Sequence, residues 1–262
     1  MKYFDSHAHY YDERFESECE RGVDDLIDAL LSSEVSAIIN VGTSPETCLK
    51  VIESVKMHKG IYSALGIHPS DSQYLVGSAE ENIAIIEKMI TDKENRCVAL
   101  GEIGLDYHYP DTNKACQMDY FLRQMSLAEK LAIPVVIHDR EAHGDIMDVI
   151  RSFPNVRGVL HSYSGSPEMA LELVRRGYMI SFSGTVSFTN AKKVREVARI
   201  LPKSAVLIET DCPYLTPHPY RGKLNHSGYL KYTNAALADA LGIDEGECAD
   251  ITDSNARRFF RI

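Results

Sequence analysis

The sequence predicts an α/β protein that folds as one domain, residues 1–262, with eight parallel strands closed into a (β/α)8, or TIM, barrel. Short β-branched or apolar runs alternate with longer amphipathic stretches along the whole chain, a pattern that favours a parallel sheet with helical crossovers. The 262 residues accommodate eight such units, and no low-complexity linker or repeat divides them. A doubly wound open sheet is the alternative arrangement of the same elements.

Each expected strand is a short run of β-branched or other apolar residues. In chain order, these runs are Tyr3–Asp5, Ser36–Val41, Ile61–Leu65, Cys97–Leu100, Pro134–Ile137, Gly158–Leu160, Met179–Phe182 and Val206–Ile208. The longer segments between them have the apolar periodicity of helices. Helices are expected near Gly22–Ser33, Pro45–Met57, Ala79–Asp92, Ala115–Leu131, His143–Ser152, Pro167–Arg176, Ala191–Leu201, Tyr229–Leu241 and Glu245–Phe259. The longest irregular piece is Pro213–Ser227, and long loops in compact domains are often functional.

Composition and charge limit the class of protein. An apolar fraction of 44% and a charged fraction of 25% are ordinary for a soluble globular protein. The six cysteines are scattered without a C-x-x-C pair, which argues against a disulfide framework or zinc ribbon and predicts a cytoplasmic location. No apolar stretch approaches the roughly 20 residues that cross a bilayer, so we expect no membrane association, and no obligate protein partner is evident. The net charge of −10 argues against broad, non-specific binding of nucleic acid but leaves a phosphate-bearing substrate open.

Residues that bind metals lie at or just after the ends of several expected strands. His7 and His9 are two residues apart, so both imidazoles point to one face if this segment is extended. In a barrel, the ends of all strands meet at one rim, where the active sites of this architecture lie. The residues expected to converge there are His7, His9, Glu102, His138, His161 and Asp211. Four imidazoles and two carboxylates suit two divalent ions with one shared carboxylate.

Other polar residues near these positions have simpler interpretations. His58, His108 and His143 fall in or beside predicted helices and loops, so we expect them to be bystanders. Asp106 and Asp139 could orient ligating histidines or could form turns. Both interpretations are consistent with the sequence.

Several motifs in chain order resemble one family, the TatD-type metal-dependent deoxyribonucleases of the amidohydrolase-like barrel superfamily. The motifs are Asp5–His9, Gly66–Pro69, Gly101–Tyr107, Pro134–His138, His161–Ser166, Ser181–Gly184, Glu209–Leu215, Tyr220–Asn225 and Asn255–Phe260. The resemblance implies a (β/α)8 barrel and hydrolysis of DNA phosphodiesters from the 3′ end. It also implies two divalent ions per chain, Mg, Mn or Zn.

The resemblance also implies a role for each residue. His7, His9 and Asp211 would hold one ion, and Glu102 would bridge it to the other. His138 and His161 would hold the second ion.

Further roles concern the reaction and the substrate. Asp211 would also take the proton of the attacking water, which with Glu102 makes it catalytic. His68 and Arg221 would face the substrate, Arg221 through the planar fork that binds phosphate.

One segment departs from the family pattern. Family members continue Arg-Gly-Lys with Arg-Asn-Glu-Pro, whereas here Leu224, Asn225 and His226 follow Lys223. This difference bears on substrate preference and on a possible third metal site, and it leaves the six expected ligands in place.

Two other functions compete with a DNA hydrolase. An amide, lactone or ester hydrolase would keep the barrel and the metals, since fold alone does not determine function. Arg221, Lys223 and Lys231 favour phosphate, and Glu102 stands where a carbamylated lysine would serve lactonases and phosphotriesterase-like enzymes. A non-catalytic scaffold is the least favoured reading, because none of the six expected ligands is replaced.

Overall fold

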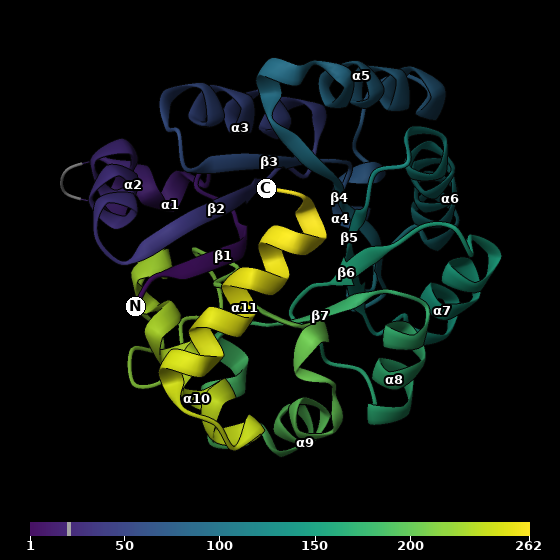
Figure 1. The fold of residues 1–262 in the computed structure, drawn as a ribbon. Coiled ribbons are helices and arrows are strands. Elements are labelled where there is room, and N and C mark those ends of the chain that lie inside the picture. The colour runs from purple at the N-terminus through teal and green to yellow at the C-terminus, as the bar shows by residue number, and fades with distance from the viewer. Residues whose placement is uncertain (20–21) are drawn as a thin grey trace.

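The fold prediction is confirmed by the computed structural model, which describes residues 1–19 and 22–262. Its eight strands follow the order β1-β2-β3-β4-β5-β6-β7-β8, and every neighbouring pair is parallel (Figure 1). The strands are β1 (Tyr3–Ala8), β2 (Val35–Val41), β3 (Ile61–Leu65), β4 (Cys97–Asp106), β5 (Val135–Arg140), β6 (Gly158–Leu160), β7 (Met179–Phe182) and β8 (Val206–Ile208). Sequential order and parallel pairing are the topology of a barrel, not of a doubly wound sheet.

Helices follow the strands and surround the barrel (Figure 1). They are α1 (Glu13–Glu18), α2 (Val23–Ser32), α3 (Pro45–Met57), α4 (Pro69–Ser72), α5 (Ala79–Thr91), α6 (Lys114–Leu131), α7 (His143–Ser152), α8 (Pro167–Arg175), α9 (Lys192–Ile200), α10 (Leu230–Leu241) and α11 (Glu245–Phe260). Short 3-10 helices lie at Lys93–Asn95, Gly184–Ser187, Lys203–Ala205 and Ser227–Tyr229. None of the helices in the described part of the chain is long and apolar enough to span a membrane.

The barrel closes where β1 meets the segment after β8. Ala8 and Cys212 form an isolated parallel bridge. The amide of His9 donates to the carbonyl of Cys212 at 2.8 Å, and the amide of Asp211 donates to the carbonyl of His7 at 2.9 Å. The closing hydrogen bonds therefore involve the same backbone segments that carry three of the expected metal ligands.

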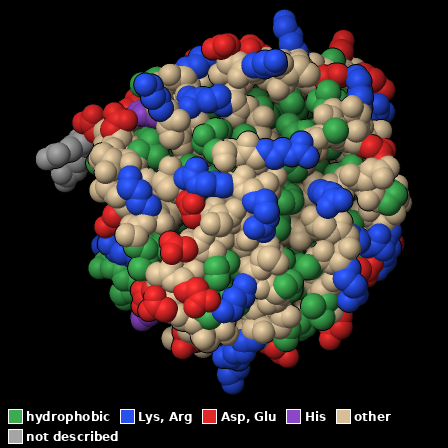
Figure 2. Space-filling model, in the orientation of Figure 1, with side chains coloured by type: hydrophobic (Ala, Val, Ile, Leu, Met, Phe, Trp, Pro, Cys, Tyr) green, Lys and Arg blue, Asp and Glu red, His purple; other side chains and the backbone are tan. Residues whose placement is uncertain are grey.

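Two hydrophobic cores hold the barrel together. One lies between the strands and the surrounding helices, and the other lies inside the barrel and includes Phe4, Val136 and Leu207. Helix α11 lies across one end of the barrel (Figure 1) and adds Phe260 to this inner core, where its ring stacks on Phe4 at 6.5 Å. Asn255 of α11 donates to the carbonyl of Val206, where β8 begins, so the end that α11 covers is the N-terminal end of the strands. Acidic, basic and hydrophobic side chains are mixed over this face (Figure 2). The C-terminal ends of the strands are left for a site.

Three strands extend beyond the C-terminal ends that the sequence pattern predicts. β1, β4 and β5 continue through polar and glycine residues, to Ala8, Asp106 and Arg140. These residues are atypical of strands by composition, yet the β4–β5 ladder includes Gly104 paired with His138. Pairing with a neighbour keeps the backbone extended, so Glu102 and His138 lie within strands, where their backbone is fixed on both sides.

Two short helices are also missing from the sequence prediction. α1 and α4 have six and four residues, too few to show a helical period. Each begins at a capping side chain: Asp12 accepts the amide of Arg14 at the start of α1, and His68 accepts the amide of Ser70 at the start of α4.

Candidate metal centre

Glu102 on β4 lies at the centre of a cluster of histidines at the C-terminal ends of the strands. Its side chain is buried, with 4% exposed. Oε1 lies 2.9 Å from both His138 Nδ1 and His161 Nε2. Oε2 faces the other way, 3.3 Å from His7 Nε2 and 3.6 Å from His9 Nε2. One carboxylate is therefore shared between two sets of nitrogen donors.

The first set is a compact triangle of donors. His138 lies on β5 and His161 directly follows β6, and their Nδ1 and Nε2 atoms are 3.3 Å apart. Glu102 Oε1 completes the triangle. His68, in the segment after β3, places Nε2 3.4 Å from the same oxygen.

The second set comes from the first and last strands, β1 and β8, which meet where the barrel closes. His7 and His9 are two residues apart in the extended segment of β1, so both rings point inward, and their Nε2 atoms lie 3.0 Å apart. Asp211 approaches from the segment after β8, with Oδ1 3.7 Å from His7 Nε2 and 3.4 Å from His9 Nε2. The structure thus brings together all six residues that the sequence predicts as ligands.

The spacing of these donors fits metal ions. Ligand atoms bound tetrahedrally at roughly 2.0–2.1 Å from an ion lie roughly 3.3 Å from one another. In the first set the donor atoms are 2.9–3.3 Å apart, and in the second set they are 3.0–3.7 Å apart. Imidazole nitrogen mixed with carboxylate oxygen is a donor set that Zn, Mn, Fe and Co accept. The residues present therefore fit the divalent metal ions that they are expected to hold.

Partners outside the cluster orient two of the imidazoles. The Nδ1–H of His9 donates to the carbonyl of Val41 at 2.8 Å, which leaves the Nε2 lone pair for the cluster. Asp106 Oδ2 lies 3.1 Å from His138 Nε2, so a proton on Nε2 leaves Nδ1 as the donor atom. A ligating histidine almost always donates its second N–H to such an acceptor. Of the two interpretations left open for Asp106, orientation of a histidine is the one that its position supports.

Electrostatics shift the donors in two directions. Neighbouring carboxylates outweigh burial and raise the pKa values of His9, His138 and His161, so an ion that binds these imidazoles displaces protons. The other three donors are held in the forms that bind metal. Burial alone would raise the pKa of Glu102, but the surrounding imidazoles, first His161 and then His68 and His7, hold it well below its usual range. Burial, reinforced by His161, lowers the pKa of His7, so this imidazole is neutral and has a free lone pair. Despite its burial, Asp211 also has a lowered pKa, because His9 hydrogen-bonds to it.

Two backbone features set the positions of these side chains. Gly104, two residues after Glu102, has φ of +134°, and a Cβ atom there would lie 2.1 Å from the carbonyl oxygen of His138. A glycine is required for β4 and β5 to approach this closely. Asp211 has φ of +56°, in the left-handed region that few non-glycine residues adopt. The hydrogen bond from its amide to the carbonyl of His7 holds it there.

The three histidines expected to be bystanders lie outside the cluster. His58 contacts the carboxylates of Asp24 and Asp28 at 3.0 and 2.8 Å. His108 and His143 each contact one carboxylate, that of Glu141 and Asp139, both at 2.7 Å. Within the described residues, none of the three belongs to a group of possible metal ligands.

Sequence reasoning gave no role to Glu209, the residue after β8. It is fully buried, accepts the amide of Ser162 at 2.7 Å and lies 3.3 Å from His161 Nδ1. Its carboxylate therefore lies beside the third of the imidazoles and favours a proton on Nδ1, which leaves Nε2 for the cluster. Its position directly after a predicted strand was a signal for a site residue, but Asp211, two residues later, accounted for that signal equally well.

Hydrogen bonds from Asn225 hold the segment that departs from the family pattern in place. This side chain is buried, and its Nδ2 donates to the carbonyls of Thr210 at 3.0 Å and Tyr214 at 2.6 Å. His226 accepts the amide of Gly228 and stacks on Tyr229, so its imidazole is used within the loop. The residues of this segment thus shape the loop that carries Asp211.

Comparison with known proteins agrees with the resemblance seen in the sequence. The family model described as TatD related DNase matches residues 4–261. The chain belongs to this family. It is 37% identical over 261 residues to the uncharacterized metal-dependent hydrolase YabD of Bacillus subtilis, covering 99% of each chain. It is 32% identical over 260 residues to the uncharacterized metal-dependent hydrolase YcfH of Escherichia coli K12, covering 98% of this chain and 95% of that one.

A solved structure supports the same assignment. The crystal structure of YJJV, a TatD homologue from Escherichia coli K12, has a TM-score of 0.89 and 26% identity, and the match covers 99% of this chain and 98% of that chain. The protein is therefore a metal-dependent hydrolase of the TatD family.

Proposed function

We propose that the protein hydrolyses phosphodiester bonds of DNA from the 3′ end, with two divalent ions, Mg, Mn or Zn, at the cluster around Glu102. The observation that carries the proposal is the double contact of Glu102, whose two oxygens face separate sets of donors. A shared carboxylate between two donor sets is the arrangement of two-metal phosphoryl-transfer sites. The TatD related DNase family supplies the support for DNA.

The residues would divide the work as follows. His7, His9 and Asp211 would hold one ion, and His138 and His161 the other. Bound ions would supply Lewis acidity and would lower the pKa of a water molecule at the centre. Asp211 is ionised and 14% exposed at the mouth of the cluster, so its carboxylate can accept a proton from that water.

Two further residues would position the substrate. Arg221 is exposed on the loop after β8, where its planar fork can bind a phosphate. His68, 3.4 Å from Glu102 Oε1, lies close enough to contact a substrate oxygen at the centre.

The test is hydrolysis of short DNA strands labelled at one end. We expect metal-loaded protein to shorten a strand labelled at its 5′ end one nucleotide at a time, and EDTA to stop the reaction until a divalent ion is added back. Glu102→Ala and Asp211→Ala should abolish hydrolysis with an unchanged circular dichroism spectrum.

Glu141→Ala is the matched control, since this exposed carboxylate lies at the same end of the barrel but pairs with His108, outside the cluster. The proposal is wrong if the protein cleaves esters or amides but no DNA, or if Glu102→Ala keeps full activity.

A further inference from the structure

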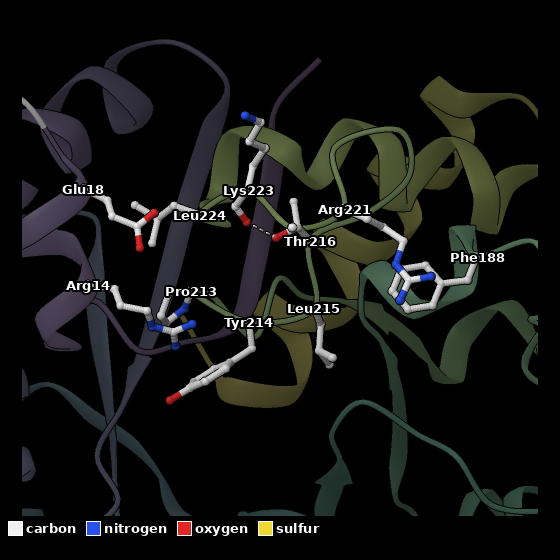
Figure 3. A pocket seen from close by; sticks show the side chains of 11 residues that line it. Arg14, Glu18, Phe188, Pro213, Tyr214, Leu215, Thr216, Arg221, Lys223 and Leu224 are labelled. Carbon is white, nitrogen blue, oxygen red and sulfur yellow. Dashed lines mark hydrogen bonds between the residues drawn. The ribbon is translucent and has the colours of Figure 1, made fainter.

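A pocket opens beside the metal centre, between α1 and the loop after β8 (Figure 3). Its volume is about 400 Å³. It is lined by Arg14, Glu18, Phe188, Pro213, Tyr214, Leu215, Thr216, Arg221, Gly222, Lys223 and Leu224. Three of these side chains are cationic and one is acidic, in a chain whose net charge is −10. Such a local reversal of charge favours an anionic ligand.

The pocket has an arginine at each end, and each arginine rests on an aromatic ring. Figure 3 shows Arg14 beside Tyr214 on one side and Arg221 over Phe188 on the other, with Thr216 between them. The guanidinium carbon of Arg14 lies 4.0 Å from the ring centre of Tyr214. For Arg221 and Phe188 the distance is 4.1 Å. Stacking of this kind fixes the plane of a guanidinium before any ligand arrives.

Asp12 fixes the orientation of Arg14 further. Its carboxylate accepts hydrogen bonds from Arg14 Nε at 3.0 Å and Nη2 at 3.2 Å. The same carboxylate accepts the hydroxyl of Tyr214 at 3.0 Å. Among the described residues, Nη1 of Arg14 has no hydrogen-bond partner. The fork is thus held in place with donor capacity left for a ligand.

The pocket is continuous with the metal centre through Tyr214. The amide of Tyr214 donates to the carbonyl of Asp211 at 2.9 Å. Its ring meets the ring of His9 edge to face, with the centres 6.5 Å apart. If the reacting phosphate of a DNA strand lies at the cluster, the neighbouring part of that DNA strand on the Asp211 side therefore reaches this pocket.

We propose that Arg14 is a specificity-determining residue that binds a second phosphate of the substrate, next to the one being hydrolysed. This inference rests on the proposed function. Arg14 would contact this second phosphate through Nη1, the nitrogen that Asp12 leaves free, while Arg221 lies at the opposite end of the pocket (Figure 3). A substrate with a second phosphate should then be preferred over one with a single phosphodiester.

Three dinucleotides test the inference. Thymidylyl-thymidine carries one phosphodiester, and its 5′-phosphorylated and 3′-phosphorylated forms carry one phosphate more. We expect wild-type protein to have a higher kcat/KM for one phosphorylated form than for the unphosphorylated one. Arg14→Gln should lower that preference about ten-fold, the effect of losing one charge-assisted hydrogen bond.

Arg151→Gln is the matched control. Arg151 on α7 also pairs with carboxylates, Asp148 and Glu172, but it lies near the C-terminus of α7, at the opposite end of the barrel. We expect it to keep the preference of the wild type.

Binding without turnover provides a second measurement. In EDTA, the affinity for an oligothymidylate should fall in Arg14→Gln, and the slope of log K against log salt should become shallower by about 0.7, the share of one phosphate contact on a single strand. Arg151→Gln should retain the wild-type slope.

The outcomes separate the two proposals. If wild-type protein cleaves none of the three dinucleotides and no longer DNA, the proposed function fails. If it cleaves all three and Arg14→Gln slows them equally, Arg14 has a merely structural role and the second-phosphate inference fails while the proposed function stands.

Discussion

Replacing Asp106 by Asn should weaken metal binding about 10- to 100-fold, the usual cost of losing an outer partner of a ligating histidine. Asp106 Oδ2 lies 3.1 Å from His138 Nε2 and favours the proton on that atom. Asparagine keeps the shape but loses the charge, so the proton can move to Nδ1, the atom that faces Glu102 Oε1 at 2.9 Å. The expected loss corresponds to roughly 1.4–2.7 kcal/mol.

The measurement is isothermal titration of metal-free protein with Zn²⁺ or Mn²⁺. We expect two ions per chain in both proteins. In the variant, the site that includes His138 should have a higher dissociation constant than in the wild type. Asp139→Asn is the matched control, because Asp139 makes the same kind of contact, 2.7 Å to the imidazole of His143, outside the cluster. The reasoning is refuted if Asp106→Asn binds metal as tightly as the wild type, or if Asp139→Asn weakens binding equally.

Three stability predictions follow from the backbone and its caps, each measured by urea unfolding. Gly104→Ala should lower the free energy of unfolding by about 2 kcal/mol or more, because the new Cβ would lie 2.1 Å from the His138 carbonyl oxygen. The control is Gly144→Ala on α7, where a Cβ meets nothing within 4 Å; it should leave this free energy unchanged or raise it by up to about 1 kcal/mol. An equal loss in both would contradict the steric argument. Asn225→Ala should cost about 1–3 kcal/mol, since two loop carbonyls lose their donor, and an unchanged unfolding midpoint would contradict this. Ser44→Ala should cost about 1 kcal/mol because it removes the capping box of α3, and an unchanged free energy of unfolding would show that the cap does not stabilise the helix.

The sequence predicted the architecture well, for reasons visible in particular elements. The bounds of β3, β6, β7 and β8 agree with the pattern of apolar runs, as do those of α3 and α7. A parallel strand buried on both faces is nearly all apolar, so its limits are visible in the chain itself. β4 continues to Asp106, whereas the prediction ended it at Leu100. The prediction stopped there because Gly101, Glu102, Gly104 and Asp106 interrupt the apolar run.

The candidate ligands were also visible in the sequence, because a parallel barrel brings all strand ends to one rim whatever the loops do. Hence His7, Glu102 and Asp211 could be expected to meet, although 109 residues separate Glu102 from Asp211 along the chain (211 − 102). The geometry of their contacts could not be predicted from the sequence. Which oxygen of Glu102 faces which histidine depends on rotamers and strand register, and these are set by packing across the barrel.

The sequence by itself determined the fold class and the residue types that converge at one end of the barrel. The apolar period and the position of a residue at a strand end can be read locally from the sequence. The barrel topology then places residues at different strand ends close to one another. The tertiary structure alone decided that Glu209 would lie beside His161, and that Arg14 and Tyr214, 200 residues apart (214 − 14), would share Asp12 beside the metal centre. The first contact joins the segments that follow β6 and β8, and the second joins the segments that follow β1 and β8 across the closure of the barrel. No local pattern encodes them, because they arise from the distance between side chains that the closed sheet imposes.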